Sequence, residues 1–415
     1  MSLRFLFVTI GYPPFQGGAQ VYVRMLAERL VAEGHRVTVL TTTAGEVEAI
    51  WDGRKKTLPS GQGIANGVRV VRFPLRHLPP SPYGYYGWRR LTGGMARIRW
   101  VPEGVLRQMA RLTPWSPGLQ RAAAEWEEPV DVVHGFTIPF ESLLLGAEAL
   151  ARRNGAAFFV TPFLHTGPEG DPSVERSYAM PHQIGLMRRA AGVVALTSIE
   201  RAFLIRRGVP ANVVHAVPAG IPLEAACSED GTAEAPAVLF LGAATYEKGA
   251  IHVAEAVRRL RAAGVDVTLD LAGTVTGQVA RYFAKLPQEE KAGIRVHGNV
   301  SEAEKRRLLA RCALLAMPSR VDSFGLVFLE AWAYGKPVIG AQAGGIPAVV
   351  DHGENGLLIR FGDVDALAGA LRALLTNRDR ARRMGAAGRD KLRSRYDWDI
   401  VYPQLLGLYQ RALQR

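Results

Sequence analysis

Short apolar runs alternate with segments of helical periodicity along almost the whole chain. In the first of these units, the run at residues 3–10 precedes Gly17-Gly18 and a helical pattern with Val21 and Leu30 on its apolar face. Strands that are apolar at every position and are separated by helices are typical of a parallel sheet covered on both faces. The alternation therefore predicts an α/β fold of the doubly wound type.

The alternation occurs twice. Further strands are expected at 36–41, 68–73, 130–134, 157–161, 192–197 and 213–217, and then at 237–241, 267–271, 294–297, 313–317 and 337–340. Residues 224–236 are small, acidic and without period, which is typical of an inter-domain linker. We predict one domain at 1–222, a linker at about 223–236, a second domain at 237–395 and an amphipathic helix near the C-terminus. Two such domains place a ligand cleft between the carboxyl ends of their sheets.

The composition is that of a globular protein, since 48% of the 415 residues are hydrophobic and 21% are charged. Cys227 and Cys312 are the only cysteines, so we expect no disulfide framework and a reducing, cytoplasmic compartment. No apolar run has the length needed to span a bilayer. The run at residues 4–10 is too short for an export signal, and we interpret it as a buried strand.

Nearly all of the net charge of +13 lies between Gly53 and Arg121, where thirteen Lys or Arg residues accompany one acid, Glu103. Interleaved aromatic residues are Tyr83, Tyr85, Tyr86, Trp88, Trp100 and Trp115. This combination describes a surface for anionic lipid headgroups; a single-stranded nucleic-acid groove and a solvated basic face are the alternatives. No recognisable nucleic-acid module accompanies it. We therefore expect no nucleic-acid partner and predict that residues 53–121 draw the protein to the inner face of an anionic membrane.

The segment 318–330 carries the most specific chemical signal. An apolar run leads into a polar turn, and a helix is expected from about Ser323, with Asp322 or Ser323 as its cap and Gly325 in its first turn. The free N–H groups and the dipole of such a helix start attract phosphate. Glu330 then lies about two turns further along a similar side. A sugar nucleotide suits this arrangement; the alternative is a capped helix with a half-buried Glu.

Six motifs between residues 239 and 358 share a specific order. They are LFLG with EKG (239–249), GNV (298–300), PS…FG…EA (318–331), GKPVIG (335–340), GGIP (344–347) and NGLL (355–358). In this order and spacing, the chain resembles the retaining glycosyltransferases of family four, which have the GT-B fold: two Rossmann-like, doubly wound domains facing each other across a cleft. The resemblance covers most of 237–415. It extends more loosely to Gly17-Gly18, His165 and residues 197–200, and it implies that the helix at about 396–415 packs back on the first domain.

The resemblance also implies a role for each matching residue. Asp322, Lys248 and His165 would be catalytic: Lys248 would pair with the donor diphosphate, Asp322 would lie near the reacting carbon, and His165 would touch the sugar. Glu330 would accept hydrogen bonds from the ribose hydroxyls. The other donor-binding residues would be Gly17, Gly18, Gly242, Gly298, Asn299, Val300, Ser323, Phe324, Gly325, Leu326, Gly344 and Gly345.

The implied activity is a metal-independent hexosyl transfer, with retention, from a UDP-, GDP- or ADP-sugar to the hydroxyl of a glycan or lipid-linked acceptor, without a further cofactor. Three residues depart from the family pattern: Ala243 stands where an Arg is usual, and Asp322 and Ala348 each stand where a Glu is usual. Arg320, or an arginine of residues 53–121, is a candidate substitute for the missing cation. A sugar-nucleotide epimerase of the same fold and a weakened or non-catalytic nucleotide-binding protein are therefore the alternatives.

Two further polar signals are interpreted as structural. Asp363-Val364-Asp365 spells the Asp-x-Asp that holds a metal in other transferases, but it precedes a helical period and is predicted to cap that helix. His134, at the end of an apolar run, is expected to be a satisfied polar residue. No His or Cys spacing suits zinc, so we expect no metal site.

Overall fold

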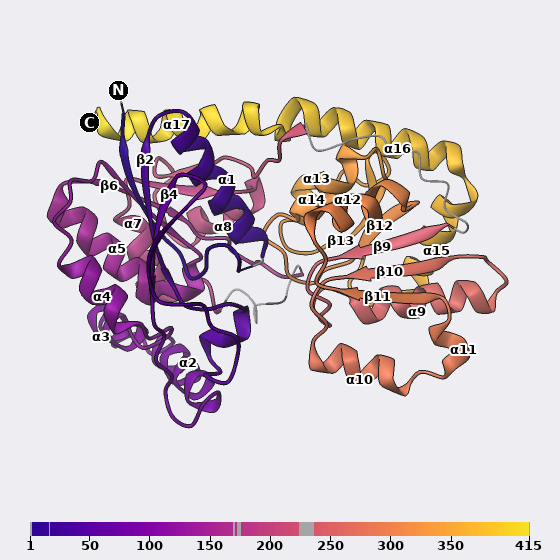
Figure 1. The fold of residues 1–415 in the computed structure, drawn as a ribbon, viewed down its shortest axis with the longest axis horizontal. Coiled ribbons are helices and arrows are strands. Elements are labelled where there is room, and N and C mark those ends of the chain that lie inside the picture. The colour runs from indigo at the N-terminus through magenta and orange to yellow at the C-terminus, as the bar shows by residue number, and fades with distance from the viewer. Residues whose placement is uncertain (1, 16, 169–170, 172–175, 224–235, 415) are drawn as a thin grey trace. The chain divides into compact units, whose positions relative to one another are not determined.

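The apolar runs expected to form strands build two separate β-sheets in the computed structural model, which describes residues 2–15, 17–168, 171, 176–223 and 236–414 (Figure 1). The chain divides into two compact units. Unit 1 comprises Met1–Leu164, Ser173–Val217 and Tyr402–Arg415, and unit 2 comprises His165–Pro172 and Pro218–Val401. Residues 165–172, which we expected in the first domain, thus belong to unit 2. Most of the expected linker, at 224–235, lies outside the described residues.

The sheet of unit 1 has eight strands in the order β3-β4-β2-β1-β5-β6-β7-β8. Their bounds are β1 Arg4–Val8, β2 Arg36–Thr42, β3 Gly61–Ala65, β4 Val68–Phe73, β5 Val132–Phe136, β6 Ala157–Thr161, β7 Gly192–Ala195 and β8 Val214–Ala216. Every neighbouring pair is parallel except β3 with β4. The central strand β1 is apolar because both of its faces are covered: Phe5, Leu6, Phe7 and Val8 are all at most 2% exposed. Each such side chain stabilises the fold by about 1.5–3 kcal/mol.

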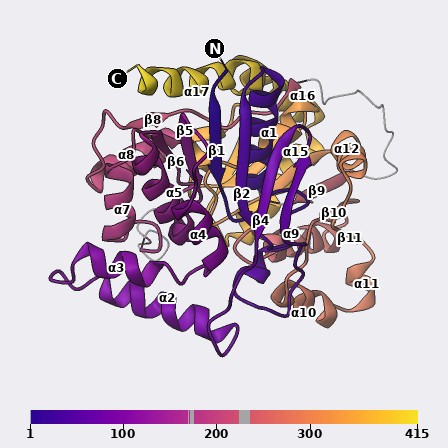
Figure 2. The ribbon, with the colours of Figure 1, turned by 60° about the vertical axis from the view of Figure 1, so that its left-hand side comes forward.

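Helices and short 3-10 turns connect the strands of unit 1 (Figure 2). They are α1 Gly18–Ala32, η1 Val47–Ile50, α2 Tyr83–Met95, α3 Glu103–Ala110, α4 Pro117–Ala124, η2 Ile138–Phe140, α5 Glu141–Asn154, α7 Pro181–Arg188 and α8 Ser198–Arg206. Helix α1 packs on β2 and β4, and α5 packs on β1, β5 and β6. The expected doubly wound arrangement, with helices between successive parallel strands, is confirmed.

The last helix, α17 (Trp398–Leu413), belongs to unit 1 from Tyr402 onward. Its Tyr409 hydroxyl lies 2.6 Å from Nδ1 of His134, and the Tyr402 hydroxyl donates to Glu33 Oε2 at 3.0 Å. Nε2 of His134 lies 2.8 Å from Thr161 Oγ1. His134 is fully buried, and its burial lowers its pKa to about 3, so the imidazole is neutral at pH 7. His134 thus joins α17 to β5 and β6.

The sheet of unit 2 has six strands, all parallel, in the order β11-β10-β9-β12-β13-β14. They are β9 Ala237–Leu241, β10 Thr268–Ala272, β11 Ile294–Gly298, β12 Leu314–Met317, β13 Val338–Ala341 and β14 Gly356–Ile359. The helices are α9 Ala250–Ala262, α10 Gly277–Lys285, α11 Gln288–Lys291, α12 Glu302–Arg311, α13 Leu326–Ala333, α14 Ile346–Val349, α15 Val364–Thr376 and α16 Arg378–Lys391, followed by the π-helical turn η4 Leu392–Tyr396. This is the second doubly wound half.

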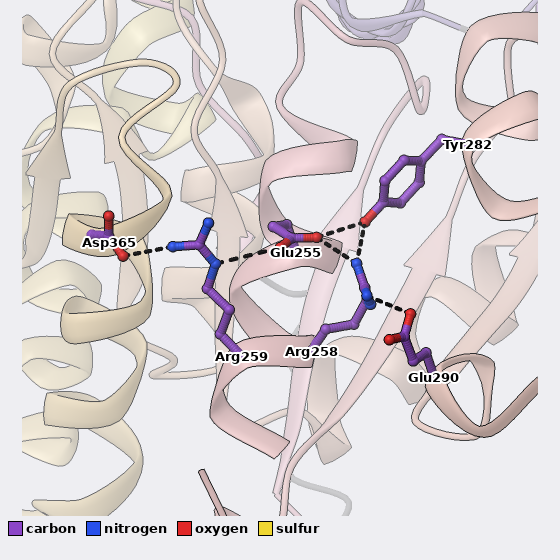
Figure 3. Close-up of polar contacts among 6 residues, drawn as sticks. All are labelled: Glu255, Arg258, Arg259, Tyr282, Glu290 and Asp365. Atoms are coloured by element: carbon purple, nitrogen blue, oxygen red, sulfur yellow. Dashed lines mark hydrogen bonds and ion pairs between the residues drawn. The ribbon is translucent and has the colours of Figure 1, made fainter. Parts of the chain in front are cut away.

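An ion network ties the outer side of α9 to the neighbouring helices of unit 2 (Figure 3). Arg258 contacts Glu255 on its own helix, Tyr282 of α10 and Glu290 of α11, while Arg259 Nη1 lies 2.5 Å from Asp365 at the start of α15. The Asp365 side chain is 91% exposed, so that pair is worth at most about 1 kcal/mol. The network thus joins α9 to α10, α11 and α15.

Candidate functional site

The loops that follow the carboxyl ends of β9, β12 and β13 meet at one edge of the unit 2 sheet. The backbone N–H of Arg320 donates to Glu247 O at 2.7 Å, which joins the loop after β12 to the loop after β9. The N–H of Gly345 donates to Asp322 O at 2.8 Å, which adds the loop after β13. Gly344 N–H donates in turn to Gly167 O at 2.8 Å, which brings the segment beginning at His165 to the same edge. This is the edge where doubly wound sheets bind ligands.

Lys248 and Asp322 form an ion pair at this edge. Lys248 Nζ lies 2.6 Å from Asp322 Oδ2 and donates to Val321 O at 3.2 Å. Thr245 Oγ1 accepts from the backbone N–H of Lys248 at 3.0 Å and fixes the turn that presents the side chain. The Lys248 side chain is 26% exposed and that of Asp322 is 12% exposed. The ammonium therefore lies against the loop that leads into α13 and still reaches solvent.

Electrostatics set the protonation of the neighbouring groups. Burial opposes ionisation of Asp322, but the Lys248 ammonium outweighs it and holds the pKa of Asp322 below its ordinary value. Burial, together with the nearby charge of Lys248, lowers the pKa of His165 to about 4. At pH 7 the edge therefore carries an ionised Asp322 and a neutral His165.

Helix α13 begins at Leu326, three residues later than the expected start at Ser323. Gly325 is its N-cap residue, with φ 88° and no side-chain cap bond, so the expected cap by Asp322 or Ser323 is wrong. Asp322 Oδ1 accepts instead from the Phe324 N–H at 3.3 Å. Among the described residues, no acceptor takes the N–H groups of Ser323, Gly325 or Leu326. These donors remain available at the positive end of the helix dipole.

Gly344 has to be a glycine because of the close approach of the loop before α13. Its φ is 61°, in the left-handed region, and a Cβ built on it would lie 2.4 Å from Asp322 O. Gly345 follows as the residue whose N–H holds that same carbonyl. The two glycines therefore fix the backbone of Asp322 at the site.

Glu330 lies on α13 and is paired with a cation. Lys305 Nζ of α12 is 2.8 Å from Glu330 Oε1 and 2.9 Å from Glu302 Oε2, and the Lys305 and Glu330 side chains are each 19% exposed. Burial opposes the charge on Lys305, yet Glu330 and Glu302 hold the pKa of Lys305 above its ordinary value. Glu330 is therefore a half-buried, paired carboxylate with a second oxygen available to accept hydrogen bonds.

Four of the predicted donor-binding residues lie at or directly after the ends of β9 and β11. Gly298 is the last residue of β11, its carbonyl accepts from the Gly273 N–H at 2.7 Å, and Asn299 Oδ1 accepts from Thr274 Oγ1 at 2.7 Å. Gly242 donates its N–H to Ala272 O at 2.9 Å at the end of β9. Gly242, Gly298, Asn299 and Val300 thus share the carboxyl edge of the sheet with Lys248. The structure brings these residues and the other predicted residues of unit 2 to that one edge.

Gly17 and Gly18 belong to unit 1, at the start of α1 after β1. Gly17 is the N-cap residue, and its carbonyl accepts from the Val21 N–H at 2.9 Å. Both glycines are exposed. They therefore lie at the carboxyl edge of their own sheet.

The suggested substitute cation, Arg320, is already held by carboxylates. Its Nη1 lies 3.1 Å from both oxygens of Glu247, and its Nη2 contacts Asp171. Ala243, after β9, is exposed and supplies no charge, and Ala348 lies in α14. Lys248 is therefore the cation that lies directly against the loop before α13.

Sequence patterns did not indicate three contributors to this edge. Lys305 pairs with Glu330, and Thr245 fixes the turn at Lys248. The third is the segment Gly167–Pro168, in which Pro168 forms an isolated β-bridge with Ala343. All are defined by contacts between loops and helices far apart in sequence. The predicted cap by Asp363 is confirmed, since its Oδ1 accepts from the Ala366 N–H at 2.9 Å. The described residues contain no group of three or more His, Cys, Asp or Glu side chains placed to hold a metal ion.

In unit 1, exposed aromatic and apolar side chains lie on α2 and in the segment leading to α3. Tyr83 is 73% exposed, Leu91 50%, Trp100 80% and Val105 44%. Leu106 of α3 is instead buried in the unit, so that helix docks on its own unit and exposes Val105 to solvent. Within the described ranges, no helix combines the length and apolar character of a membrane span.

Two family models match the chain. The model described as "Glycosyl transferase 4-like domain" matches residues 17–220, and the one described as "Glycosyl transferases group 1" matches residues 229–391. The chain is 27% identical over 424 residues to a glycogen synthase of Mycobacterium tuberculosis (99% of this chain, 95% of that protein). It is 29% identical over 422 residues to a GDP-mannose-dependent alpha-(1-6)-phosphatidylinositol monomannoside mannosyltransferase of the same species (97% of each).

Solved structures resemble the whole chain. Sucrose-phosphate synthase from Thermosynechococcus elongatus superposes with a TM-score of 0.72 at 21% identity, covering 99% of both chains. HepE from Anabaena, in complex with UDP-glucose, gives a TM-score of 0.70 at 18% identity, covering 99% of this chain and 100% of that one. At these identities the likeness concerns the fold.

Proposed function

Because the chain belongs to the group 1 glycosyltransferases, with the GT-B fold and a glycosyltransferase activity, we propose that it transfers a sugar, with retention, from a nucleoside-diphosphate sugar to an acceptor hydroxyl. One observation carries the proposal: the Lys248 ammonium lies against the loop before α13, where the N–H groups of Ser323, Gly325 and Leu326 are available. A cation and several donors converging at a helix start bind a diphosphate and stabilise the charge that it gains as it leaves.

The roles of the other residues follow from their places at this edge. Glu330, oriented by Lys305, would accept hydrogen bonds from the ribose hydroxyls. Asp322 would contact the transferred sugar after releasing Lys248 to the diphosphate, and the neutral His165 would exchange hydrogen bonds with a sugar hydroxyl. Asp322, Lys248 and His165 are thus our proposed catalytic residues.

The remaining donor contacts come from backbone. Gly344-Gly345 would line the phosphate pocket, the segment Gly298–Val300 would border the base, and Gly17-Gly18 would face the donor phosphate or the acceptor. Positive charge at the leaving group would come from Lys248 and the amides, so the proposed transfer requires no metal. The protein would act by positioning and electrostatics, without a covalent nucleophile.

The domains that we propose are those expected from the sequence, an acceptor-side domain at 1–222 carrying the helix at 396–415 and a donor-binding domain at 237–395, except that residues 165–172, 218–222 and 396–401 group with the donor-binding unit. Two similar proteins support the substrate classes that we propose. The mycobacterial mannosyltransferase is GDP-mannose-dependent and its name refers to a phosphatidylinositol glycolipid, and HepE was solved with UDP-glucose. We propose a hexosyl donor and a glycan or lipid-linked acceptor. The enzyme would work in the cytoplasm, peripherally on the inner face of the membrane through residues 53–121.

A thermal-shift screen with UDP, GDP and ADP identifies the donor base, because a ligand of the folded state raises the melting temperature by mass action. Incubation of the matching sugar nucleotides with glycan and lipid acceptors then tests the transfer. We expect a product with the anomeric configuration of the donor, and an inverted product would rule out the retaining mechanism.

Interconversion of sugar nucleotides without an acceptor would instead indicate an epimerase. Nucleotide binding without any turnover would indicate a protein weakened at Ala243, Asp322 and Ala348.

A further inference from the structure

A pocket of about 170 Å³ opens on the surface of unit 1 between α3 and α5. The side chains of Arg107, Gln108, Arg111 and Arg152 form its polar lining, and Leu145 and Ala149 of α5 form its apolar lining. The pocket therefore presents guanidinium groups and no carboxylate to whatever enters it.

The acids nearest to the pocket are already matched by arginines. Arg107 Nη2 lies 2.5 Å from Glu148 Oε2, and Arg189 Nε lies 2.6 Å from the other oxygen of Glu148. Arg189 Nη2 lies 2.9 Å from Glu103 Oε1, and Arg107 Nη1 lies 3.6 Å from that same oxygen. Two carboxylates and two guanidinium groups thus form a neutral network beside the pocket.

Arg111 and Arg152 also line the pocket but do not belong to this network. Both are exposed, and within the described residues neither forms an ion pair. Arg111 caps the C-terminus of α3, and Arg152 lies in the last turn of α5. Each helix terminus carries roughly half a negative charge, and Arg153 adds a further cation to the last turn of α5, so an excess of positive charge remains. An anionic phosphodiester suits this excess.

The surface around the pocket is apolar as well as basic. Val105, on α3 itself, is 44% exposed, and Ile98 and Trp100, just before that helix, are 37% and 80% exposed. Helix α2 lies beside α3 (Figure 2) and adds the exposed side chains of Tyr83 and Leu91. A soluble phosphate gains nothing from this apolar surface, whereas a phospholipid places apolar chains beside its headgroup.

We infer that the pocket between α3 and α5 binds the phosphate group of an anionic phospholipid headgroup, with Arg111 and Arg152 as its direct ligands and Val105 and Trp100 at the lipid surface beside it. The inference assigns a defined site that combines Arg111 of the proposed membrane-binding stretch with Arg152 of α5. It does not depend on sugar transfer, because it is tested without donor or acceptor.

The test compares two double variants that lose the same charge. Arg111→Gln/Arg152→Gln removes the pocket ligands, and Arg36→Gln/Arg206→Gln removes two exposed arginines of unit 1 outside residues 53–121. Binding to vesicles of phosphatidylglycerol and phosphatidylcholine is measured by sedimentation. We expect roughly 30-fold weaker binding for the pocket variant, because each lost arginine weakens binding about fivefold. The matched variant should bind less than about threefold more weakly than the wild type. Equal losses for both variants would overturn the inference.

Titration with inorganic phosphate, without vesicles, distinguishes a headgroup from a free anion. We expect a dissociation constant above about 1 mM for the wild type, since a few charge-assisted hydrogen bonds at an open site give little net affinity. A dissociation constant below about 10 µM that the Arg111→Gln/Arg152→Gln variant abolishes would assign the pocket to free phosphate. That result would overturn the headgroup assignment. Circular dichroism of both double variants is the folding control: unchanged spectra show that a loss of binding does not result from misfolding.

Discussion

Two polar clusters, one in each unit, are held together by different forces. In unit 1, His134 is fully buried and neutral between Tyr409 and Thr161, at distances of 2.6 and 2.8 Å. In unit 2, Lys248 and Asp322 form an ion pair 2.6 Å long at the edge of the sheet, in which Lys248 is partly exposed and Asp322 is buried. The first cluster joins a helix to a sheet through neutral hydrogen bonds, and the second joins two loops through opposite charges.

The difference between the two clusters shows which polar contacts a ligand can replace. Removing a partner from a buried hydrogen bond leaves an unsatisfied group and costs about 1–3 kcal/mol. The Lys248 side chain is 26% exposed, so an incoming diphosphate can reach its ammonium and replace Asp322 as its partner. The His134 cluster is therefore structural, and the Lys248 cluster is available to a ligand.

Lys248→Met should have the largest effect of the variants that test this contrast. Loss of the cation at the leaving group should lower kcat by about 10²–10³-fold, the range for removal of one oxyanion-stabilising donor. The variant also leaves the buried Asp322 carboxylate without its cation and loses stability, so kcat is compared at a temperature where the variant is folded. The measurements are initial rates with the donor found by thermal shift, and the melting temperature without ligand.

Lys285→Met is the matched control for Lys248→Met. Lys285 is an exposed lysine at the end of α10 in the same unit, and within the described residues it forms no ion pair. Its loss changes the net charge equally and should leave kcat within about twofold. Equal loss of activity in both variants would show that Lys248 acts through overall charge rather than at the diphosphate.

The second largest effect is expected in the pH dependence of the unfolding free energy, which should differ between the two clusters. Folded His134 has a pKa of about 3, whereas an unfolded histidine titrates near 6.5. Between these values the unfolded state binds the extra proton, so stability from this site is full above pH 6.5 and falls as the pH drops toward 3. The slope is at most about 1.4 kcal/mol per pH unit, or roughly 2–3 kcal/mol between pH 6.5 and 4.5.

His134→Gln removes that titration. The difference in unfolding free energy between wild type and variant, measured by urea denaturation from pH 7 to 4.5, should shrink steadily as the pH falls. Parallel curves over the range would mean that His134 is protonated in the folded state. Asp322 contributes in another window: its lowered pKa makes its contribution full above the ordinary Asp range and lost only in more acidic solution.

Lys305→Met should have a smaller effect, confined to recognition of the ribose. Without Lys305, Glu330 loses the ammonium that lies 2.8 Å from its carboxylate, so its orientation toward a diol is no longer fixed. We expect about tenfold weaker binding of the preferred nucleoside diphosphate and a much smaller change for its 2′-deoxy analogue. Calorimetry with both ligands measures the discrimination. Lys305→Arg should preserve it, and equal weakening of both ligands by Lys305→Met would argue against a ribose role for Glu330.

Much of the fold follows from the sequence because buried parallel strands are apolar at every position. The expected strands at 68–73, 157–161 and 237–241 coincide with β4, β6 and β9, and the boundaries of the other expected strands shift by a few residues. β3 was not expected, because Gly61 and Gly63 interrupt its apolar pattern. It is an exposed, antiparallel edge strand, which needs no apolar face.

The site was predictable in its residue types but not in its contacts. Lys248 and Asp322 are 74 residues apart in the sequence, and Lys305 and Glu330 are 25 apart, so local patterns do not show that they pair. The start of α13 was misplaced for a related reason. Asp322 and Ser323 are good caps by residue type, but Lys248 and the Phe324 N–H engage the Asp322 carboxylate, and the helix begins after the left-handed Gly325.

Tyr409→Phe is expected to cause the smallest change in the unfolding free energy. It tests the His134 cluster of unit 1 without altering the Lys248 cluster. It removes the hydroxyl that lies 2.6 Å from His134 Nδ1 and leaves a buried ring nitrogen without its partner, at a cost of about 1 kcal/mol. The matched variant Tyr402→Phe removes a hydroxyl from the same helix, whose acceptor Glu33 has a 36% exposed side chain that water can solvate. Its cost should be about 0.5 kcal/mol or less. Urea denaturation at pH 7 compares the two variants, and nucleotide affinity should be unchanged in both. If Tyr402→Phe proved the more costly, the attachment of α17 would depend on its exposed contact rather than on the buried histidine.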